Sequence, residues 1–226
     1  KRVRALTVDE QQQFTNWLLN KNIDNCRYKN VFLIQMYMGL RVGEVLALTQ
    51  NDIDLKNRKI RIHRTLTTDE NNAIIMGETT KTEAGKRVLA LPDYLYPHII
   101  EQMKFAESQE NNTEKLLFKP ENQNYTRRTN VNSELKRILK TNFNIEDIST
   151  HSLRHTYCTR CIEAGMEPMV VASFLGQSDI EMVYSVYTDI QERFRTNELT
   201  KINRYYMNEK LINTVVENLD TTEMER

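Results

Sequence analysis

Two histidines and an arginine share one helical turn in the second half of the chain, and this arrangement suits the binding of an anion. His151, Arg154 and His155 stand at i, i+3 and i+4 in HSLRHT, so their side chains lie on one helix face. Ser149 or Thr150 can cap this helix, leaving free N–H groups and the positive dipole end beside them. Helix starts of this kind bind phosphate. A surface helix whose histidines bond to core carbonyls explains this motif alone equally well.

The tyrosines that follow favour phosphate chemistry. The segment LGQSDIEMVYSVYTDI, residues 175–190, contains Tyr184 and Tyr187. A phenol has a pKa of about 10, so it attacks phosphorus at neutral pH only where cations stabilise the developing charge. An arginine offers two donors that fit phosphate oxygens. These residue types therefore indicate phosphoryl transfer through a covalent tyrosine.

Other classes of catalytic site lack their residues in this sequence. The segments around His151 and Tyr187 contain no Asp or Glu set with ligand-like spacing, and H-x-x-x-H lacks the glutamate of a zinc protease. No Walker loop, G-x-S-x-G or Rossmann glycine pattern occurs. Cys158 and Cys161 form a C-x-x-C inside a helical pattern, without a second pair. We therefore expect structural thiols in a reducing compartment, no metal and no cofactor.

Length and composition limit the classes of protein. The 226 residues allow one large domain, or a domain with an appendage. Lys plus Arg number 31 and Asp plus Glu number 31, so any nucleic-acid surface must be local. No stretch resembles a membrane span or a secretory signal. We expect a soluble intracellular protein.

Helical periodicity surrounds one segment of strand pattern. Thr7 and Glu10 have capping-box spacing ahead of the first apolar helix pattern. Short β-rich runs between residues 52 and 91 predict a small antiparallel sheet. The last third of the chain is helical, with breaks at Gly165 and Gly176. Helices before that part are expected over about residues 8–20, 25–38, 42–49, 93–105 and 127–140.

Four ordered motifs resemble the catalytic domain of tyrosine recombinases, the family of phage and conjugative-transposon integrases. They are GLRVGEVLAL, HSLRHT, LGQSDI and VYTD. The resemblance implies an α+β fold, mainly α-helical, with a small antiparallel three-stranded β-sheet. It also implies DNA cleavage and rejoining without metal, through a 3′-phosphotyrosyl intermediate and a Holliday junction. It divides the chain into an interdomain linker remnant at 1–6, a catalytic domain at 7–190 and a C-terminal helical tail at 191–226.

The resemblance gives roles to the residues that match its motifs. Arg41 in GLRVGE matches the first catalytic arginine and Arg154 matches the second, so both would grip the non-bridging oxygens of the scissile phosphate. His151 matches the histidine that assists proton movement at the tyrosine. Tyr187 matches the nucleophile. Tyr184 lies too close to LGQ for that role.

Further assignments rest on the same resemblance. Lys81, on the predicted hairpin TTKTEAGKRVLALP, resembles the general acid of the family, and Lys86 is the alternative. Glu44 and His155 resemble residues that orient the arginines and the nearby loop. Gln177 departs from the family, which usually has His and sometimes Trp there. An amide donates a hydrogen bond but cannot become cationic, so we expect a loss of about 1.5–3 kcal/mol, or about ten- to a hundredfold in rate.

The partners implied are double-stranded DNA and further copies of this chain, with no membrane. The tail segment MNEKLINTVVENL predicts an amphipathic helix, which packs on its own domain or is exchanged between protomers of a tetramer. The location implied is the cytoplasm of a bacterial cell or phage-infected host. Two other functions stay open. One is a type IB topoisomerase-like relaxing enzyme, and the other is a DNA-binding regulator with weakened or lost activity, which Gln177 favours.

Overall fold

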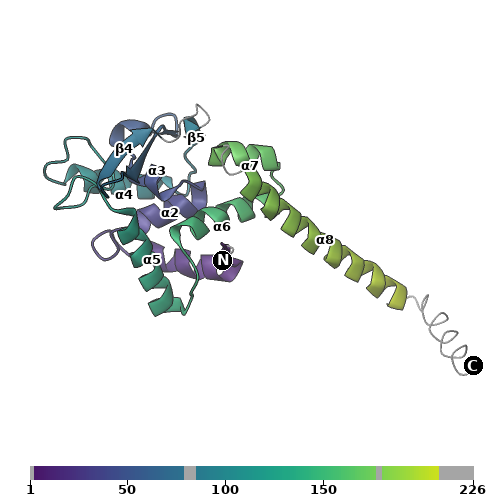
Figure 1. Ribbon diagram of the computed structural model, residues 1–226. Helices are drawn as coiled ribbons and strands as arrows, with labels where there is room; N and C mark the ends of the chain where they lie inside the picture. Colours follow the sequence, from purple (N-terminus) through teal and green to yellow (C-terminus); the bar gives the residue numbers. More distant parts are fainter. Residues whose placement is uncertain (1–2, 79–84, 177–179, 209–226) are drawn as a thin grey trace, which may run out of the picture. The chain divides into compact units, whose positions relative to one another are not determined.

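The computed structural model describes residues 3–78, 85–176 and 180–208, and the chain divides into two compact units, Lys1–Val183 and Tyr184–Arg226 (Figure 1). The second unit contains the larger part of the last helix. The helices are α1 (Val8–Leu19), α2 (Lys29–Met38), α3 (Val42–Leu46), α4 (Tyr96–Glu107), α5 (Arg128–Phe143), α6 (Thr150–Glu163), α7 (Pro168–Leu175) and α8 (Ile180–Asn208), with a 3-10 turn, η1 (Gln50–Asp52), after α3. This order confirms the mainly helical prediction.

The first two helices begin for local reasons. α1 has the predicted capping box, because Thr7 Oγ1 accepts a hydrogen bond from Glu10 N at 3.1 Å and Glu10 Oε2 accepts one from Thr7 N at 2.8 Å. α2 begins at Lys29, later than predicted. The Asn22 side chain accepts a hydrogen bond from Asn25 N at 2.9 Å, which holds the residues before α2 in turns.

The strand segment forms the predicted three-stranded antiparallel sheet and a separate two-stranded sheet. β1 (Ile53–Asp54), β2 (Lys59–Ile62) and β5 (Arg87–Ala90) are ordered β1-β2-β5, whereas β3 (Arg64–Thr68) pairs with β4 (Ile74–Glu78). The β-rich run KIRIHRTL belongs to two different strands, β2 and β3, which separate at His63. The His63 ring and the Arg64 guanidinium each lie 2.7 Å from a carboxylate oxygen of Asp52, which fixes the chain at this point.

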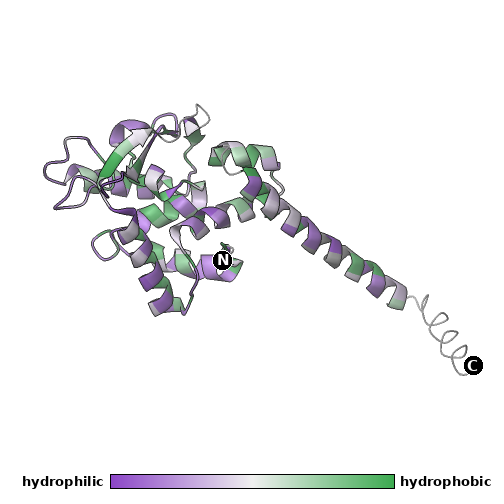
Figure 2. Ribbon diagram, in the orientation of Figure 1, coloured by the Kyte–Doolittle hydropathy of each residue, from purple (hydrophilic) through white to green (hydrophobic). Residues whose placement is uncertain are grey.

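The core of the first unit is built around α2. Every residue of this helix except Tyr37 is buried, as expected for a helix that is apolar on nearly all sides. α2 packs against α6, which carries the predicted anion-binding turn. α5, by contrast, has one buried face. Figure 2 shows hydrophobic and hydrophilic residues alternating along α5, whose buried Val131, Leu135 and Ile138 repeat with helical spacing.

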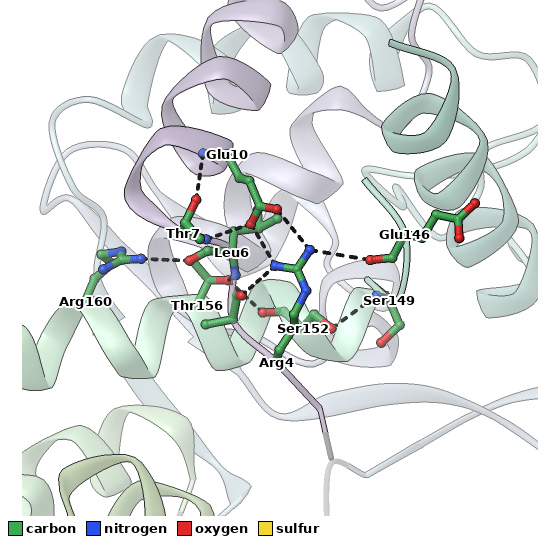
Figure 3. A network of polar contacts seen from close by, with 10 residues as sticks. Arg4, Leu6, Thr7, Glu10, Glu146, Ser149, Ser152, Thr156 and Arg160 are labelled. Carbon is green, nitrogen blue, oxygen red and sulfur yellow. Dashed lines mark hydrogen bonds and ion pairs between the residues drawn. The ribbon is translucent and has the colours of Figure 1, made fainter. Parts of the chain in front are cut away.

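The segment that precedes α1 is bound to α6 (Figure 3). Leu6 N donates to Thr156 Oγ1 at 2.9 Å, and Arg160 Nη2 donates to Leu6 O at 2.7 Å. Arg4 forms an ion pair with Glu10 at 2.7 Å. Leu6 is buried in the core. These contacts connect the beginning of the chain to the helix that carries the HSLRHT motif.

The three cysteines are buried and none forms a disulfide. Burial raises the pKa of Cys26 to about 11 and also raises the pKa of Cys161. Such thiols stay protonated at neutral pH, as predicted for structural cysteines. Among the helices that the structure describes, none combines the length and the apolar character needed to cross a membrane.

Candidate active site

A cavity of about 150 Å³ in the first unit brings together side chains from segments that are far apart in the sequence. Arg41, His151 and Arg154, three of the predicted catalytic residues, line it together. The complete lining consists of Gln35, Arg41, Val42, Gly43, Thr65, Arg128, Thr150, His151 and Arg154. The structure therefore assembles two of the four motifs, GLRVGEVLAL and HSLRHT, around one small space.

Arg154 joins the GLR turn to the end of α7. Its side chain is fully buried, and its guanidinium donates to Gly39 O at 2.5 Å and to Leu175 O at 2.6 Å. Gly39 ends α2 in the left-handed conformation, with φ of 68°. A Cβ added there would lie 2.4 Å from Cδ1 of Tyr157, so glycine is required both by the turn and by the close approach of α6.

Arg41 is held by Glu44, the carboxylate that the family resemblance associates with orientation of the arginines. Arg41 is the N-cap residue of α3, and Glu44 accepts hydrogen bonds from Arg41 N at 3.0 Å and from Arg41 Nη1 at 3.2 Å. The Glu44 side chain is fully buried, whereas the Arg41 side chain is 27% exposed. Arg41 is therefore held by a fully buried carboxylate, while its side chain is still partly exposed and lines the cavity.

Arg87 on β5 is the buried partner of Glu44, and the sequence did not single it out. Its Nη1 and Nη2 atoms lie 3.2 and 2.9 Å from the two Glu44 oxygens, and its Nε donates to Phe174 O at 2.7 Å. Burial alone would raise the pKa of Glu44, but the hydrogen bonds and charge of Arg87, with the backbone hydrogen bond from Arg41 and the charge of Arg154, outweigh burial and lower it. Glu44 is thus a carboxylate at neutral pH, and Arg87 connects the β5 strand to the Arg41 anchor.

The two histidines of α6 have different surroundings. His151 is exposed in the first turn, and it lines the cavity. His155 is partly buried, and its Nδ1 lies 3.4 Å from Thr159 Oγ1. Ser149 is the N-cap residue of α6, which settles the choice left open between Ser149 and Thr150. His151 therefore meets the arginines at the cavity, whereas His155 lies one turn further along α6.

Arg128 is a cavity residue that the sequence analysis missed. It is the first residue of α5, is exposed, and comes from a segment outside all four motifs. Its Cδ would lie 3.6 Å from a Cβ added at Gly43, so its side chain passes over the start of α3. The same added Cβ would lie 2.5 Å from Thr65 Oγ1. The only signal in the sequence is the basic pair in TRRT, which is common on solvated surfaces.

The remaining predicted residues lie elsewhere. Lys81 and Gln177 fall outside the described residues, and the alternative general acid Lys86 is exposed just before β5. Tyr187 lies on α8 in the second unit, where it is partly buried, and Tyr184 is 46% exposed. The amphipathic pattern predicted at the extreme C-terminus also falls almost entirely outside the described residues.

The cavity is suited to an anion such as a phosphate. Three arginines and one histidine line it, and no Asp or Glu occurs among the described residues of its lining. Arginine forms paired, charge-assisted hydrogen bonds with phosphate oxygens. Donors that are fixed before the substrate binds stabilise the charge that develops on those oxygens during reaction.

Comparison with known proteins gives a consistent picture. Residues 4–193 match the Phage integrase family. The transposase from transposon Tn916 of Enterococcus faecalis is 27% identical over 217 residues, covering 91% of this chain and 53% of that protein. A XerC-like tyrosine recombinase of Caldanaerobacter subterraneus subsp. tengcongensis is 27% identical over 197 residues, covering 80% and 50%. The chain thus spans about half the length of these relatives.

Solved structures share the fold. The Tn1549 transposon integrase in complex with transposon right end DNA superposes with a TM-score of 0.73 at 23% identity, covering 88% of this chain and 67% of that one. The XerA recombinase superposes with a TM-score of 0.66 at 16% identity, covering 85% and 64%. The predicted fold of a tyrosine recombinase catalytic domain is confirmed.

Proposed function

Because this chain belongs to the phage integrase family, we propose that it is the catalytic part of a site-specific DNA recombinase that cleaves and rejoins strands through a phosphotyrosyl intermediate. The observation that supports this proposal is the cavity in which Arg41, His151 and Arg154 meet. Phosphoryl transfer depends on position and charge more than on covalent groups of the protein. The proposed reaction uses no metal ion and no cofactor.

The proposed chemistry is a pair of transesterifications. Tyr187 Oη attacks the scissile phosphorus while His151 assists removal of the phenol proton. The bond from phosphorus to the 5′ oxygen breaks, and that oxygen takes a proton from Lys81. The products are a 3′-phosphotyrosyl bond and a free 5′-hydroxyl. In the second step a 5′-hydroxyl of the partner strand attacks the phosphotyrosine, which restores the diester and releases Tyr187.

Charge stabilisation at the phosphate is the role proposed for the arginines. Arg41 and Arg154 would bind the two non-bridging oxygens, and loss of one such fixed donor costs about 2.7–4 kcal/mol, or about 10²–10³ in rate. Glu44 would orient Arg41, and His155 would support the loop beside the cavity. Gln177 would supply one neutral hydrogen bond to the phosphate, weaker than the bond from a protonated histidine.

Double-stranded DNA is the proposed substrate, acted on in the bacterial cytoplasm. The solved Tn1549 integrase, which has a similar fold, is in complex with transposon DNA. We propose that four protomers assemble on two DNA sites, and that residues 191–226 form the tail that passes between neighbours. Residues 1–6 would be the interdomain linker and residues 7–190 the catalytic domain. Contacts with the DNA backbone should make binding sensitive to salt, although the net charge is zero.

The test is trapping of the covalent intermediate. A library of DNA duplexes of randomised sequence, each nicked so that the short fragment carrying the new 5′-hydroxyl diffuses away after cleavage, is incubated with the 226-residue chain in EDTA. We expect a protein–DNA complex that survives SDS, and we expect none with Tyr187→Phe. Tyr184→Phe is the matched control, because this phenol lies one helical turn earlier and should be dispensable.

Other outcomes would assign a different function. DNA binding without any covalent complex would identify a regulator that kept the fold and lost the activity. A covalent complex with relaxation of supercoiled plasmid, but without recombination between two selected sites, would identify a topoisomerase-like enzyme. A covalent complex that persists in Tyr187→Phe would show that another residue is the nucleophile.

A further inference from the structure

Gln35 is a buried polar residue in the middle of an apolar helix. It interrupts the run VFLIQMYM of α2, and only 1% of it is exposed. Burial of an amide costs free energy unless its hydrogen bonds are replaced, so a hydrophobic residue would be the simpler choice here. The contacts of Gln35 show what the amide provides instead.

One amide group of Gln35 bridges the two segments that lead into the cavity. Gln35 Nε2 donates to Leu40 O at 3.4 Å and to Thr150 O at 3.3 Å. Leu40 directly precedes Arg41, and Thr150 directly precedes His151. The orientation of the amide is fixed by this contact, because a flipped amide would place its oxygen against two carbonyl oxygens.

The bridge is also suited to small adjustments. Both distances exceed the usual value of about 2.9–3.0 Å, as expected when one amino group serves carbonyls on two different elements. Contacts of this kind tighten when a substrate draws the surrounding groups together. A phosphate that pulls Arg41 and His151 inward would therefore shorten both bonds of Gln35.

The oxygen of the same amide has no hydrogen-bond partner among the described residues, although it is buried. Buried polar atoms are nearly always paired, so such an atom needs an explanation. Gln35 lines the cavity together with Arg41 and His151. The amide is therefore held through its amino group, by the two carbonyls that lead into Arg41 and His151.

We propose that Gln35 is a positioning residue for the phosphoryl transfer, which sets the spacing and orientation of Arg41 relative to His151. This inference rests on the proposed function, and it adds a residue from α2 that lies outside every motif of the family resemblance. Gln35 touches no reacting atom in this account. It acts through the peptide units that carry the two catalytic side chains.

The test compares two buried amides of the same helix. Gln35→Met keeps the size and helix preference of the side chain but removes the bridge. Asn30→Leu is the matched control, because Asn30 is also buried, donates to Gln102 Oε1 at 3.1 Å, and also has an unpartnered oxygen, yet does not line the cavity. Both variants are measured for cleavage of the nicked duplex library at saturating protein, and for DNA affinity in the Tyr187→Phe background.

We expect Gln35→Met to cleave about ten- to a hundredfold more slowly with an unchanged DNA affinity, because misplaced groups reduce the rate of the chemical step. Asn30→Leu should cleave at the rate of the parent protein. Equal cleavage by Gln35→Met and the parent protein would overturn the inference. So would equal slowing by both variants, which would reflect a general loosening of α2.

A second measurement separates this inference from the proposed function. Hydrogen exchange of the backbone amides in residues 40–44 and 150–153 reports the bridge without any activity. We expect faster exchange in both segments of Gln35→Met and no change there in Asn30→Leu. If the parent protein forms no covalent complex, the proposed function fails, and the exchange pattern still decides whether Gln35 joins the two segments. Unchanged exchange in Gln35→Met refutes the bridge.

Discussion

Replacing Arg87 by Met should destabilise the first unit by leaving a buried carboxylate without its main partner. Glu44 is fully buried and Arg87 is 8% exposed, so water cannot replace the lost guanidinium. Arg41 would be the remaining cation in contact with Glu44, at 3.2 Å. The same substitution removes the hydrogen bond from Arg87 Nε to Phe174 O. The substitution should therefore lower the free energy of unfolding and also disturb the position of Arg41.

The size of the effect follows from the burial of the pair. Breaking a buried ion pair by removing one partner costs about 3–5 kcal/mol. Because Arg41 still contacts Glu44, we expect the lower end, about 3 kcal/mol. In a domain of this size each kcal/mol lowers the melting temperature by about 2–4 °C, so the shift should be about 6–12 °C. Glu44→Met in the same protein should recover part of this loss, because an apolar side chain needs no partner.

The pH dependence has a definite sign. The pKa of Glu44 is lowered in the folded protein, so this carboxylate contributes stability above its unfolded pKa and loses it as the pH falls through the folded value. In Arg87→Met burial is opposed less strongly, and Glu44 takes up a proton at a higher pH. The difference in unfolding free energy between parent and variant should therefore be largest near neutral pH and should shrink on acidification below about pH 4.

Urea unfolding at pH 7 and pH 3 measures this difference, and the four proteins of the Arg87→Met and Glu44→Met cycle isolate the coupling between the two side chains. A variant within 1 kcal/mol of the parent at pH 7 would contradict the account of the buried pair. An equal loss at both pH values would show that packing of the Arg87 stem, and not charge, is the cause.

Three further predictions concern the proposed reaction. Arg128→Ala should slow cleavage about ten- to a hundredfold and reduce the salt slope of DNA binding by about one. The control is Arg127→Ala, which changes a neighbouring exposed arginine outside the cavity lining and should leave the cleavage rate within about twofold. Gln177→His should raise the cleavage rate about ten- to a hundredfold, because a protonated ring restores a cationic donor, and an unchanged or lower rate would refute this reasoning. Truncation after Asn208 should abolish cooperative assembly on two DNA sites in gel-shift titrations while leaving single-site cleavage, and intact cooperativity would show that the tail packs on its own domain.

The parts of the site that the sequence revealed are those encoded by short local patterns. His151 and Arg154 lie one turn apart on α6, so helical spacing alone placed them on one face. Arg41 closely follows the left-handed Gly39, and it is the N-cap residue of the short helix α3, which contains Glu44. In each case the partners are separated by three residues or fewer, and local geometry fixes their relation.

The parts that the sequence did not reveal depend on contacts between distant segments. Arg87 reaches Glu44 across 43 positions of the chain, and Gln35 reaches Thr150 across 115. A single sequence contains no signal for such pairs, because an arginine on a strand and a glutamine on a helix are ordinary residues until the fold brings their partners near. The separation of β2 from β3 at His63 likewise depends on a side chain outside both strands, the Asp52 carboxylate.

In the described part of the site, side chains hold the carbonyl groups at the ends of two helices, α2 and α7. At the end of α2, Arg154 donates a hydrogen bond to Gly39 O, and Gln35 donates one to Leu40 O. At the end of α7, Arg87 donates a hydrogen bond to Phe174 O, and Arg154 donates one to Leu175 O. Carbonyls at a helix C-terminus carry partial negative charge, so buried guanidinium groups stabilise them there. Arg154 is bound at both ends, so the residue predicted to grip the phosphate also holds the GLR turn and the LG turn in place. A substitution of Arg154 therefore removes a proposed phosphate-binding side chain and also loosens the two turns that position the other catalytic residues. Its effects on cleavage rate and on stability should be inseparable, whereas a substitution of Gln35 should change the cleavage rate separately from stability.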